Sequence, residues 1–302
     1  MARLTGKLAH LHTRKLAYSP TRKLAYSQTC KLAHSQTCKP AHSPTRPLFE
    51  VKMIEEFVEV GVVKELYRFP VKSMRGEMLE EAYAYWHGLD GDRRYAFVRA
   101  DNRSGFPWLT GRELPQLLQF TPRYTQPDDV AESPVEVTLP NGRILPIDAP
   151  ELNQQLAEAY GKPVNLIKIG RGAFDSQVIS VMSTATVAAL GEAIGTAVGG
   201  KISPLRFRQN IIIEPFDEQP FVEERWLDSS LVFGNQADGL RLRLNRRIQR
   251  CVMINIDPET SDKEPAVLKT VTQTRQNCAG VFGSTERPGN IRLGDVVKLV
   301  RV

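Results

Sequence analysis

Short runs of strand-forming residues, separated by turn signals at intervals of about ten residues, constrain the fold of this chain more than any other feature. The runs form two sets, over 60–69, 94–99 and 135–139, and over 209–214, 229–233, 240–244, 251–256 and 296–302. Asn141-Gly142 lies at the centre of a hairpin turn after the third run. Strands of this length and spacing favour a barrel or a sandwich over a parallel, doubly wound sheet.

Only two helices are expected between these strands, over 149–160 and 183–194. Pro150 and Gly161 mark the ends of the first helix, and Ser183 is the expected N-cap of the second. The predicted fold is therefore mainly β, of the α+β class, with two β-barrel-like domains and a few short helices. We expect a tail over residues 1–52, an N-terminal domain over 58–172 and a second domain over 173–302.

The tail contains five near-identical copies of an octamer over residues 7–46, beginning KLAHLHTR. The unit carries too few apolar residues to bury a face, so we expect disorder. A mitochondrial targeting segment and a nucleic-acid-binding or metal-binding tail are both open. We favour a translated nucleotide repeat upstream of Met53, because selection for charge does not explain such regular octamers. A native targeting tail would imply a mitochondrial protein, and its absence a cytoplasmic one.

The excess positive charge of the chain lies in this tail. The net charge is +6, yet residues 1–52 hold ten Lys and Arg and one acid, Glu50, which leaves 30 basic and 33 acidic residues in 53–302. A mildly acidic body argues against a nucleic-acid partner. No apolar run reaches the roughly 18 residues of a membrane span, so no transmembrane segment is expected.

Histidine and cysteine are scarce in the body of the chain. It has one histidine, His87, in a turn-like segment, which excludes a zinc site of several histidines and makes a Ser-His-Asp triad depend on that residue. The four cysteines form no C-x-x-C pair, as expected for a reducing compartment. They also cannot supply the four clustered thiolates of an iron–sulfur centre.

Basic and hydroxyl residues recur at the ends of predicted strands and in predicted loops. They are Lys72 and Ser73, Arg93, Arg112, and Arg206 with Arg208. Arginine and lysine at such turns are suited to binding an anion that carries phosphate.

Two cysteines of the body are candidates for chemistry. Cys278 precedes Ala279-Gly280 and follows Arg275 closely, and a thiolate near a cation can ligate a soft metal or act as a nucleophile. Cys251 begins an apolar run and is more typical of a buried, small hydrophobic residue. Both roles stay open, with Cys278 favoured.

Taken in order, several segments resemble the MOSC family together with its N-terminal β-barrel partner domain, the architecture of the mitochondrial amidoxime-reducing component and its bacterial counterparts. The matching segments are LYRFPVKS (66–73), GDRRYAFV (91–98), TGRELP (110–115), STATVAAL (183–190), RFRQNIII (206–213), EERW (223–226), RCVMINIDPET (250–260), EPAVLKT (264–270) and RPGNIRLGDVV (287–297).

The resemblance implies the molybdenum–molybdopterin cofactor, whose pterin bears a terminal phosphate and chelates the metal through sulfur. The residues that it implies for cofactor binding are Lys72, Ser73, Arg93, Arg112, Ser180, Ser183, Arg208 and Asn210. It implies Cys278 as the metal ligand and catalytic residue, whereas counting from Leu268-Lys269 without gaps places Thr274 in that position. At the level of the superfamily only, it is also associated with pyridoxal phosphate binding.

The function that the resemblance implies is reduction of small N-hydroxylated or related N-oxygenated compounds. Electrons would come from a separate donor protein of the ferredoxin or cytochrome b5 type, since no redox module follows the last predicted strand. The alternative is a non-enzymatic carrier of the cofactor or of sulfur. The oligomeric state is not defined by the sequence.

Overall fold

The computed structural model of the protein describes residues 56–127, 129–176, 178–195, 202–235 and 238–301. The octamer repeat, with every interpretation of it, lies outside the described residues. The described residues all belong to one compact unit. Within the described ranges, no helix is long and apolar enough to cross a membrane.

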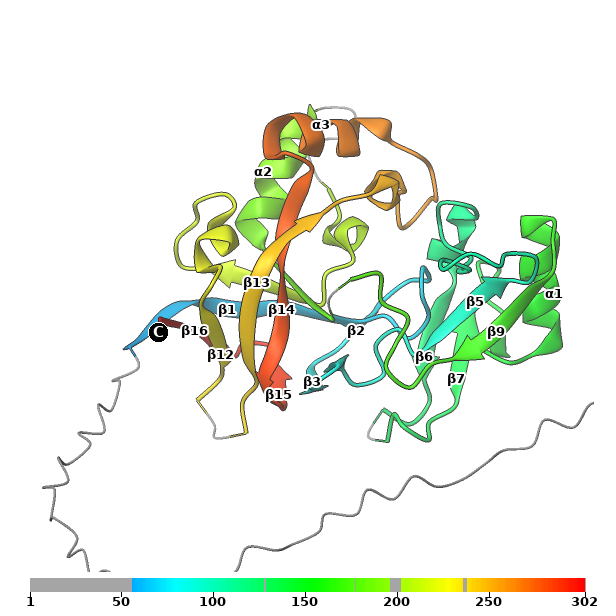
Figure 1. The fold of residues 1–302 in the computed structure, drawn as a ribbon, viewed down its shortest axis with the longest axis horizontal. Helices are drawn as coiled ribbons and strands as arrows, with labels where there is room; N and C mark the ends of the chain where they lie inside the picture. Colours follow the sequence, from blue (N-terminus) through cyan, green and yellow to red (C-terminus); the bar gives the residue numbers. More distant parts are fainter. Residues whose placement is uncertain (1–55, 128, 177, 196–201, 236–237, 302) are drawn as a thin grey trace, which may run out of the picture. The chain divides into compact units, whose positions relative to one another are not determined.

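A closed barrel of seven strands is the largest element of the fold (Figure 1). The order around it is β11-β10-β14-β13-β12-β16-β1, and β1 pairs back onto β11; the β10–β11 pair is parallel and the other pairs are antiparallel. The strands are β1 (Glu56–Arg68), β10 (Ile179–Ser183), β11 (Ile211–Pro215), β12 (Ser230–Phe233), β13 (Arg241–Gln249), β14 (Cys278–Arg287) and β16 (Val296–Arg301).

Strand β1 belongs by sequence to the first set of predicted strands, yet it completes this barrel. Its Val63 and Leu66 are buried in the same core as Val181, Ile213 and Leu299. A Cβ at Gly61 would lie 2.5 Å from the Glu214 carbonyl oxygen, so only glycine permits the close approach of β1 to β11. The predicted boundary at 172/173 stays a prediction, and β1 lies on the other side of it from the remaining barrel strands.

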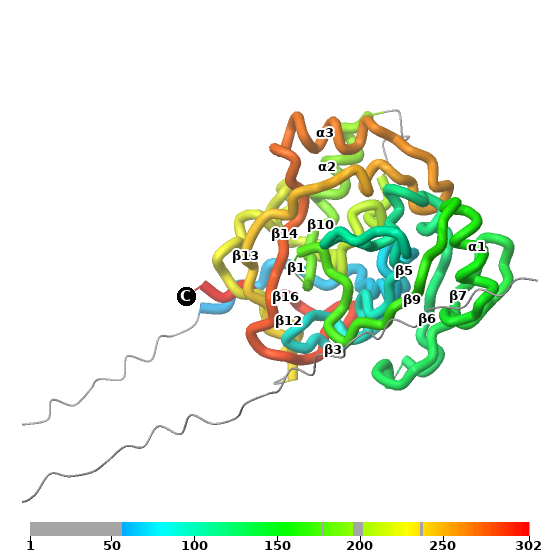
Figure 2. The backbone as a smooth tube through the Cα atoms, turned by 45° about the vertical axis from the view of Figure 1, so that its right-hand side comes forward, coloured from blue at the N-terminus to red at the C-terminus, as the bar shows by residue number. Residues whose placement is uncertain are grey.

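The segment between β1 and β10 forms smaller sheets around a core of its own. Strand β5 (Tyr95–Arg99) pairs with β9 (Val164–Lys168), and β6 (Thr121–Tyr124), β7 (Val135–Thr138) and β8 (Ile144–Pro146) form an antiparallel sheet. The predicted hairpin turn connects β7 to β8, with Gly142 at φ 83°. Both views show α1 (Pro150–Tyr160) at the outer edge of these strands (Figures 1 and 2).

Two further small pairings connect distant parts of the chain. Strand β2 (Glu77–Met78) extends the end of β1, and β15 (Gly289–Arg292) pairs with β3 (Glu81–Tyr85), which in turn pairs with β4 (Gly88–Leu89). The β15–β3 pair joins the C-terminal part of the chain to the segment that follows β1.

Helices α2 (Thr184–Ile194) and α3 (Pro265–Arg275) cover one end of the barrel in both views (Figures 1 and 2). Their apolar side chains, among them Leu190, Val267 and Val271, pack with Phe207 and Ile254 into a third core. Short 3-10 helices complete the described chain: η1 (Pro115–Gln119), η3 (Pro204–Phe207), η4 (Val222–Trp226) and η5 (Val252–Asn255).

The mainly β fold predicted from the sequence is confirmed, and both predicted helices are present. The strand predicted over 251–256 is wrong, because Val252–Asn255 forms the 3-10 helix η5. Ile254 and Ile256 are buried whereas Val252 is 48% exposed, so the apolar run turns instead of continuing the sheet. A short apolar run does not distinguish these two conformations.

Candidate functional site

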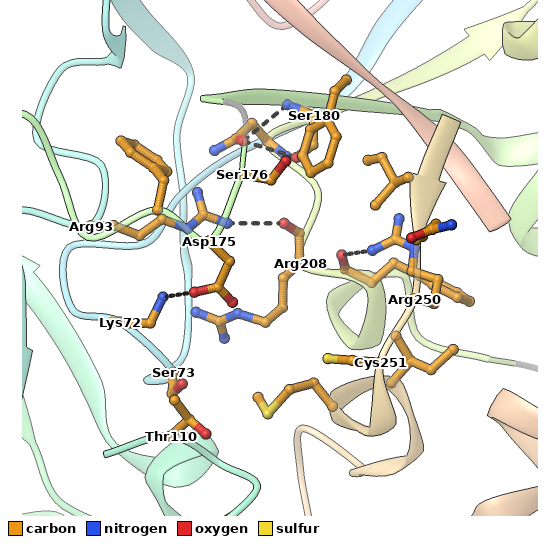
Figure 3. A pocket seen from close by; sticks show the side chains of 18 of the residues that line it. Lys72, Ser73, Arg93, Thr110, Asp175, Ser176, Ser180, Arg208, Arg250 and Cys251 are labelled. Carbon is orange, nitrogen blue, oxygen red and sulfur yellow. Dashed lines mark hydrogen bonds and ion pairs between the residues drawn. The ribbon is translucent and has the colours of Figure 1, made fainter. Parts of the chain in front are cut away.

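A cavity of about 350 Å³ lies between the barrel and the segment that follows β1 (Figure 3). Its lining includes eight cationic side chains: Lys72, Arg93 and Arg112 from the segment between β1 and β10, and Arg206, Arg208, Arg246, Arg247 and Arg250 from the later part. One carboxylate, Asp175, belongs to the lining. Such a surface favours a ligand that carries several negative charges.

Three residues of the lining adopt a left-handed backbone that side chains usually avoid. The φ angles are 65° at Ser73, 50° at Arg93 and 52° at Arg208. Each such residue costs roughly 1–3 kcal/mol, and the surrounding structure must hold it in place. Strain of this kind clusters at functional sites, and here all three side chains contribute to one cavity.

The buried carboxylate of Asp92 holds the cavity wall together. It accepts the backbone N–H of Phe69 at 2.7 Å and the Asn210 amide at 3.0 Å, and it forms an ion pair with Arg93. Its side chain is fully buried. Asp92 therefore fixes Arg93, from one part of the chain, against Asn210 from the other.

Asn210 also forms hydrogen bonds with Ser180 on β10. Its Oδ1 accepts the Ser180 hydroxyl at 2.9 Å, and its backbone N–H donates to the Ser180 Oγ at 3.0 Å. Its Nδ2 also donates to the Tyr67 carbonyl at 3.2 Å. Asn210 and Ser180 line the cavity, but their polar groups are mainly engaged in joining its walls.

Arg208 has a hydrogen-bond donor that nothing in the described chain accepts. Its Nη1 donates to the Met74 carbonyl at 2.7 Å, and its guanidinium lies 4.3 Å from the centre of the Phe69 ring. The Nη2 is buried and has no partner. Burial, and then the charge of Arg93, lower the Arg208 pKa to about 9. An anion in the cavity would satisfy the free donor and favour the charged form.

Lys72 reaches the cavity beside the connection between β9 and β10 (Figure 3). Its amino group donates to the Ala173 carbonyl at 2.7 Å and to Asp175 Oδ1 at 2.5 Å. Burial lowers the Lys72 pKa, and the charge of Asp175 opposes that effect.

Arg250 and Cys251 follow the end of β13 and lie together at the cavity (Figure 3). The Arg250 guanidinium donates to the backbone carbonyls of Ala279, at 2.8 and 2.6 Å, and of Phe207, at 2.8 Å. None of these acceptors is a carboxylate, and burial lowers the Arg250 pKa to about 9. Cys251 is a free, exposed thiol beside this cation.

The structure brings together seven of the nine site residues predicted from the sequence. Lys72, Ser73, Arg93, Arg112, Ser180, Arg208 and Asn210 line the cavity. Ser183 does not: it is the N-cap of α2, fully buried, accepting the Thr186 N–H at 3.1 Å and donating to Glu223 at 2.7 Å.

Neither predicted candidate for the metal ligand belongs to the cavity lining. Cys278 is the buried first residue of β14, where it pairs with Gln249. Thr274 is on α3, and its hydroxyl donates to the Thr270 carbonyl. Cys251 lines the cavity instead, because the chain leaves the sheet after Gln249. The signal that could have indicated it is the charged residue directly before the thiol, Arg250.

Within the part of the chain that the structure describes, no three His, Cys, Asp or Glu side chains form a group able to hold a metal ion. A metal in this cavity would therefore depend on a single thiolate and on ligands that a bound group brings with it.

Two family models match successive parts of the chain. The MOSC N-terminal β-barrel domain matches residues 60–168, and the MOSC domain matches residues 169–298. The chain belongs to the MOSC family. The two matches together include every residue that lines the cavity, which therefore lies between the two matched regions.

Individual relatives of this MOSC protein are distant. Mitochondrial amidoxime-reducing component 1 of Homo sapiens is 25% identical over 295 residues, covering 80% of this chain and 84% of the human protein. The crystal structure of the YUAD protein from Bacillus subtilis shares 13% identity with a TM-score of 0.45, over 82% of this chain and all of that one.

Proposed function

We propose that this protein is a molybdenum-cofactor-dependent reductase of small N-hydroxylated or related N-oxygenated compounds. The observation that carries the proposal is the cavity itself, whose described lining combines eight cations with a single exposed thiol, Cys251. The name of the human relative, an amidoxime-reducing component, supports the class of substrate.

The residues of the cavity fit the cofactor that the MOSC family implies. A phosphorylated pterin requires cations and hydrogen-bond donors, and the unpartnered Nη2 of Arg208 is such a donor. A soft metal chelated by sulfur accepts a thiolate as a further ligand, which Cys251 can supply.

Each group has a distinct part in holding the cofactor. Arg208 would bind its phosphate, Lys72 and Arg93 would lie along its pterin, and Asp92 would keep Arg93 in position. Cys251 would bind the metal through its sulfur. When bound, the cofactor supplies the two-electron redox chemistry that no side chain of the cavity provides.

The overall reaction needs two electrons from outside the chain. Reduction of an N–OH group to N–H consumes two electrons and two protons and releases one water. We infer a separate electron-donor protein, of the ferredoxin or cytochrome b5 type, as the source. The substrate would enter through the same open cavity, so the bound cofactor must leave room for it.

The first prediction concerns the two cysteines. Cys251→Ser should lower the molybdenum content of the purified protein at least about tenfold, because a hydroxyl is a poor ligand for a soft metal. Cys278→Ser is the matched control and should retain the metal, since this thiol is buried in β14 away from the cavity lining. Metal analysis by mass spectrometry, together with pterin fluorescence, measures both variants.

The outcomes separate the possible functions. Loss of molybdenum in Cys278→Ser with retention in Cys251→Ser would contradict the assignment of Cys251. A wild-type protein that holds the cofactor, yet does not reduce an aryl amidoxime with a chemical electron donor, would be a carrier. A protein that acquires neither molybdenum nor pterin in a host that supplies both would contradict the proposal.

A further inference from the structure

Among the described residues that line the cavity, Asp175 is the one carboxylate. It lies on the connection between β9 and β10, which is fixed by two backbone contacts. The Ala173 N–H donates to the Arg93 carbonyl at 2.8 Å, and the Ala173 carbonyl accepts Lys72 at 2.7 Å. The connection that carries Asp175 is thus held by Lys72 and Arg93, two residues of the cation cluster.

The carboxylate of Asp175 is only partly used. Its Oδ1 binds Lys72, but 56% of its side chain is exposed, against 8% for Lys72. From the described part of the chain, its Oδ2 accepts no hydrogen bond. Figure 3 shows the side chain among Lys72, Arg93 and Arg208, where a bound ligand would reach it. A carboxylate can accept several hydrogen bonds, so Asp175 retains acceptor capacity.

In a cavity that only binds anions, a carboxylate would not strengthen binding. Asp175 opposes an anion and competes with it for Lys72. The eight cations recognise the phosphate of a ligand, so they do not by themselves select the organic part that carries it. A carboxylate in such a place is useful where the ligand has hydrogen-bond donors as well as anionic groups.

A pterin is a ligand of this mixed kind. Its 2-amino group and the adjacent N3–H form a flat donor edge that matches the two oxygens of a carboxylate. We propose that Asp175 recognises this donor edge and thereby selects a pterin from among the anions that the cations attract. The inference rests on the proposed function, since the pterin is the organic part of the cofactor.

Lumazine provides a matched probe for the test, because an oxygen replaces the 2-amino group of pterin. The full chain is produced in a host that makes no molybdenum cofactor, and is titrated at neutral pH with 6-hydroxymethylpterin and with 6-hydroxymethyllumazine. The quenching of probe fluorescence reports binding. The wild type should bind the pterin at least about tenfold more tightly, since a site that accepts a donor rejects an analogue lacking it.

Asp175→Asn should abolish or invert this preference, because an amide can donate to the oxygen of lumazine. Asp217→Asn is the control: Asp217 is also an exposed carboxylate paired with one cation, Arg225, but it does not line the cavity. It should retain the wild-type preference. Equal affinities in the wild type, binding of neither probe, or an unchanged preference in Asp175→Asn would each overturn the proposal.

A parallel titration with inorganic pyrophosphate identifies the main alternative. Tighter pyrophosphate binding by Asp175→Asn, with the pterin preference unchanged, would show that Asp175 only competes with anions, and would overturn the proposal. A second measurement, the cofactor content of protein made in a host that synthesises the molybdenum cofactor, distinguishes failure of the role of Asp175 from failure of the proposed function. Normal content without selectivity for pterin would remove the role of Asp175 alone, whereas absence of the cofactor would remove the proposed function.

Discussion

Arg208 combines three costs at one residue: a left-handed backbone, a buried charge and an unpartnered donor. None of these stabilises the fold by itself. The Met74 carbonyl and the Phe69 ring position the side chain, but they offset only part of the cost of burying it. A bound anion would satisfy the donor and the charge together, so the strain is understandable as preparation for a ligand.

Two substitutions at Arg208 separate strain from binding. Arg208→Gly should be more stable than Arg208→Ala by about 1 kcal/mol, because glycine adopts a φ of 52° without a steric penalty. Both variants should bind inorganic pyrophosphate roughly 10-fold or more weakly, since both lose a charged donor. Urea unfolding and calorimetric titration measure the two effects.

Equal stability of the glycine and alanine variants would show that the backbone at Arg208 carries no strain. Undiminished pyrophosphate binding in both would remove Arg208 from the anion site.

At the scale of elements, the buried carboxylate of Glu223 holds the N-terminus of α2. Glu223 Oε2 accepts the hydroxyls of Ser183, at 2.7 Å, and Thr186, at 2.8 Å, while Oε1 has no hydrogen-bond partner among the described residues. Burial is the main cause that raises the pKa of Glu223. Ser183 is consequently part of the support of α2 and not of the cavity lining, as its local sequence predicted, whereas the family resemblance implied a cofactor contact.

Substitutions at Ser183 test this support. Ser183→Ala should cost about 1–2 kcal/mol of unfolding free energy, through loss of the cap and of a Glu223 partner. Ser183→Asp should cost more, although aspartate is normally a good N-cap, because its carboxylate would lie beside Glu223. Pyrophosphate binding should not change in either variant. A stability of Ser183→Asp equal to the wild type would contradict the contact with Glu223.

Elements with strong local signals were predictable from the sequence, and those set by packing were not. Helix α2 has a capping serine and a run of helix-forming residues. Helix α3 is rich in valine and threonine, and it was missed because its helical state depends on burying Val267 and Val271. Five of the cavity cations, Lys72, Arg93, Arg112, Arg206 and Arg208, were predicted because turns and strand ends place them locally, whereas Arg246, Arg247 and Arg250 were not. Cys251 was a candidate for chemistry but was expected to be buried, since its exposure depends on how η5 packs under α3.

The contact that holds η5 beneath α3 is the Asn255 Oδ1, which accepts the Leu268 N–H at 2.8 Å. The Arg206 guanidinium adds a second contact at the Asn255 carbonyl, at 3.1 Å. These partners lie 13 and 49 residues away in sequence. Because these partners are distant in sequence, the residues around Cys251 do not predict the contacts. The direction of its thiol is therefore known only from the folded structure.

At the scale of the whole molecule, β1 links the folding of the two matched regions, because it belongs by sequence to one region and by pairing to the other. This strand lies mainly within the N-terminal match, yet it pairs with β11 and β16 and closes the barrel of the other region. The same segment continues directly into Lys72 and Ser73, so the barrel wall and the cavity wall are one piece of chain. A shared strand therefore fixes the two halves of the cation cluster relative to each other.

The dependence predicts the behaviour of fragments. Residues 169–302 alone, which include the whole MOSC match, should not unfold cooperatively, because β11 and β16 would have unpaired edges and the core would lack Val63 and Leu66. Residues 53–302 should unfold in one cooperative transition. Adding residues 53–68 as a separate peptide should restore part of the structure of the shorter fragment, measured by circular dichroism and by amide exchange. A fragment 169–302 that unfolds as sharply as 53–302 would show that β1 contributes little to the barrel, and the Asp92–Asn210 contact and the β15–β3 pair would then be what joins the two halves of the cavity.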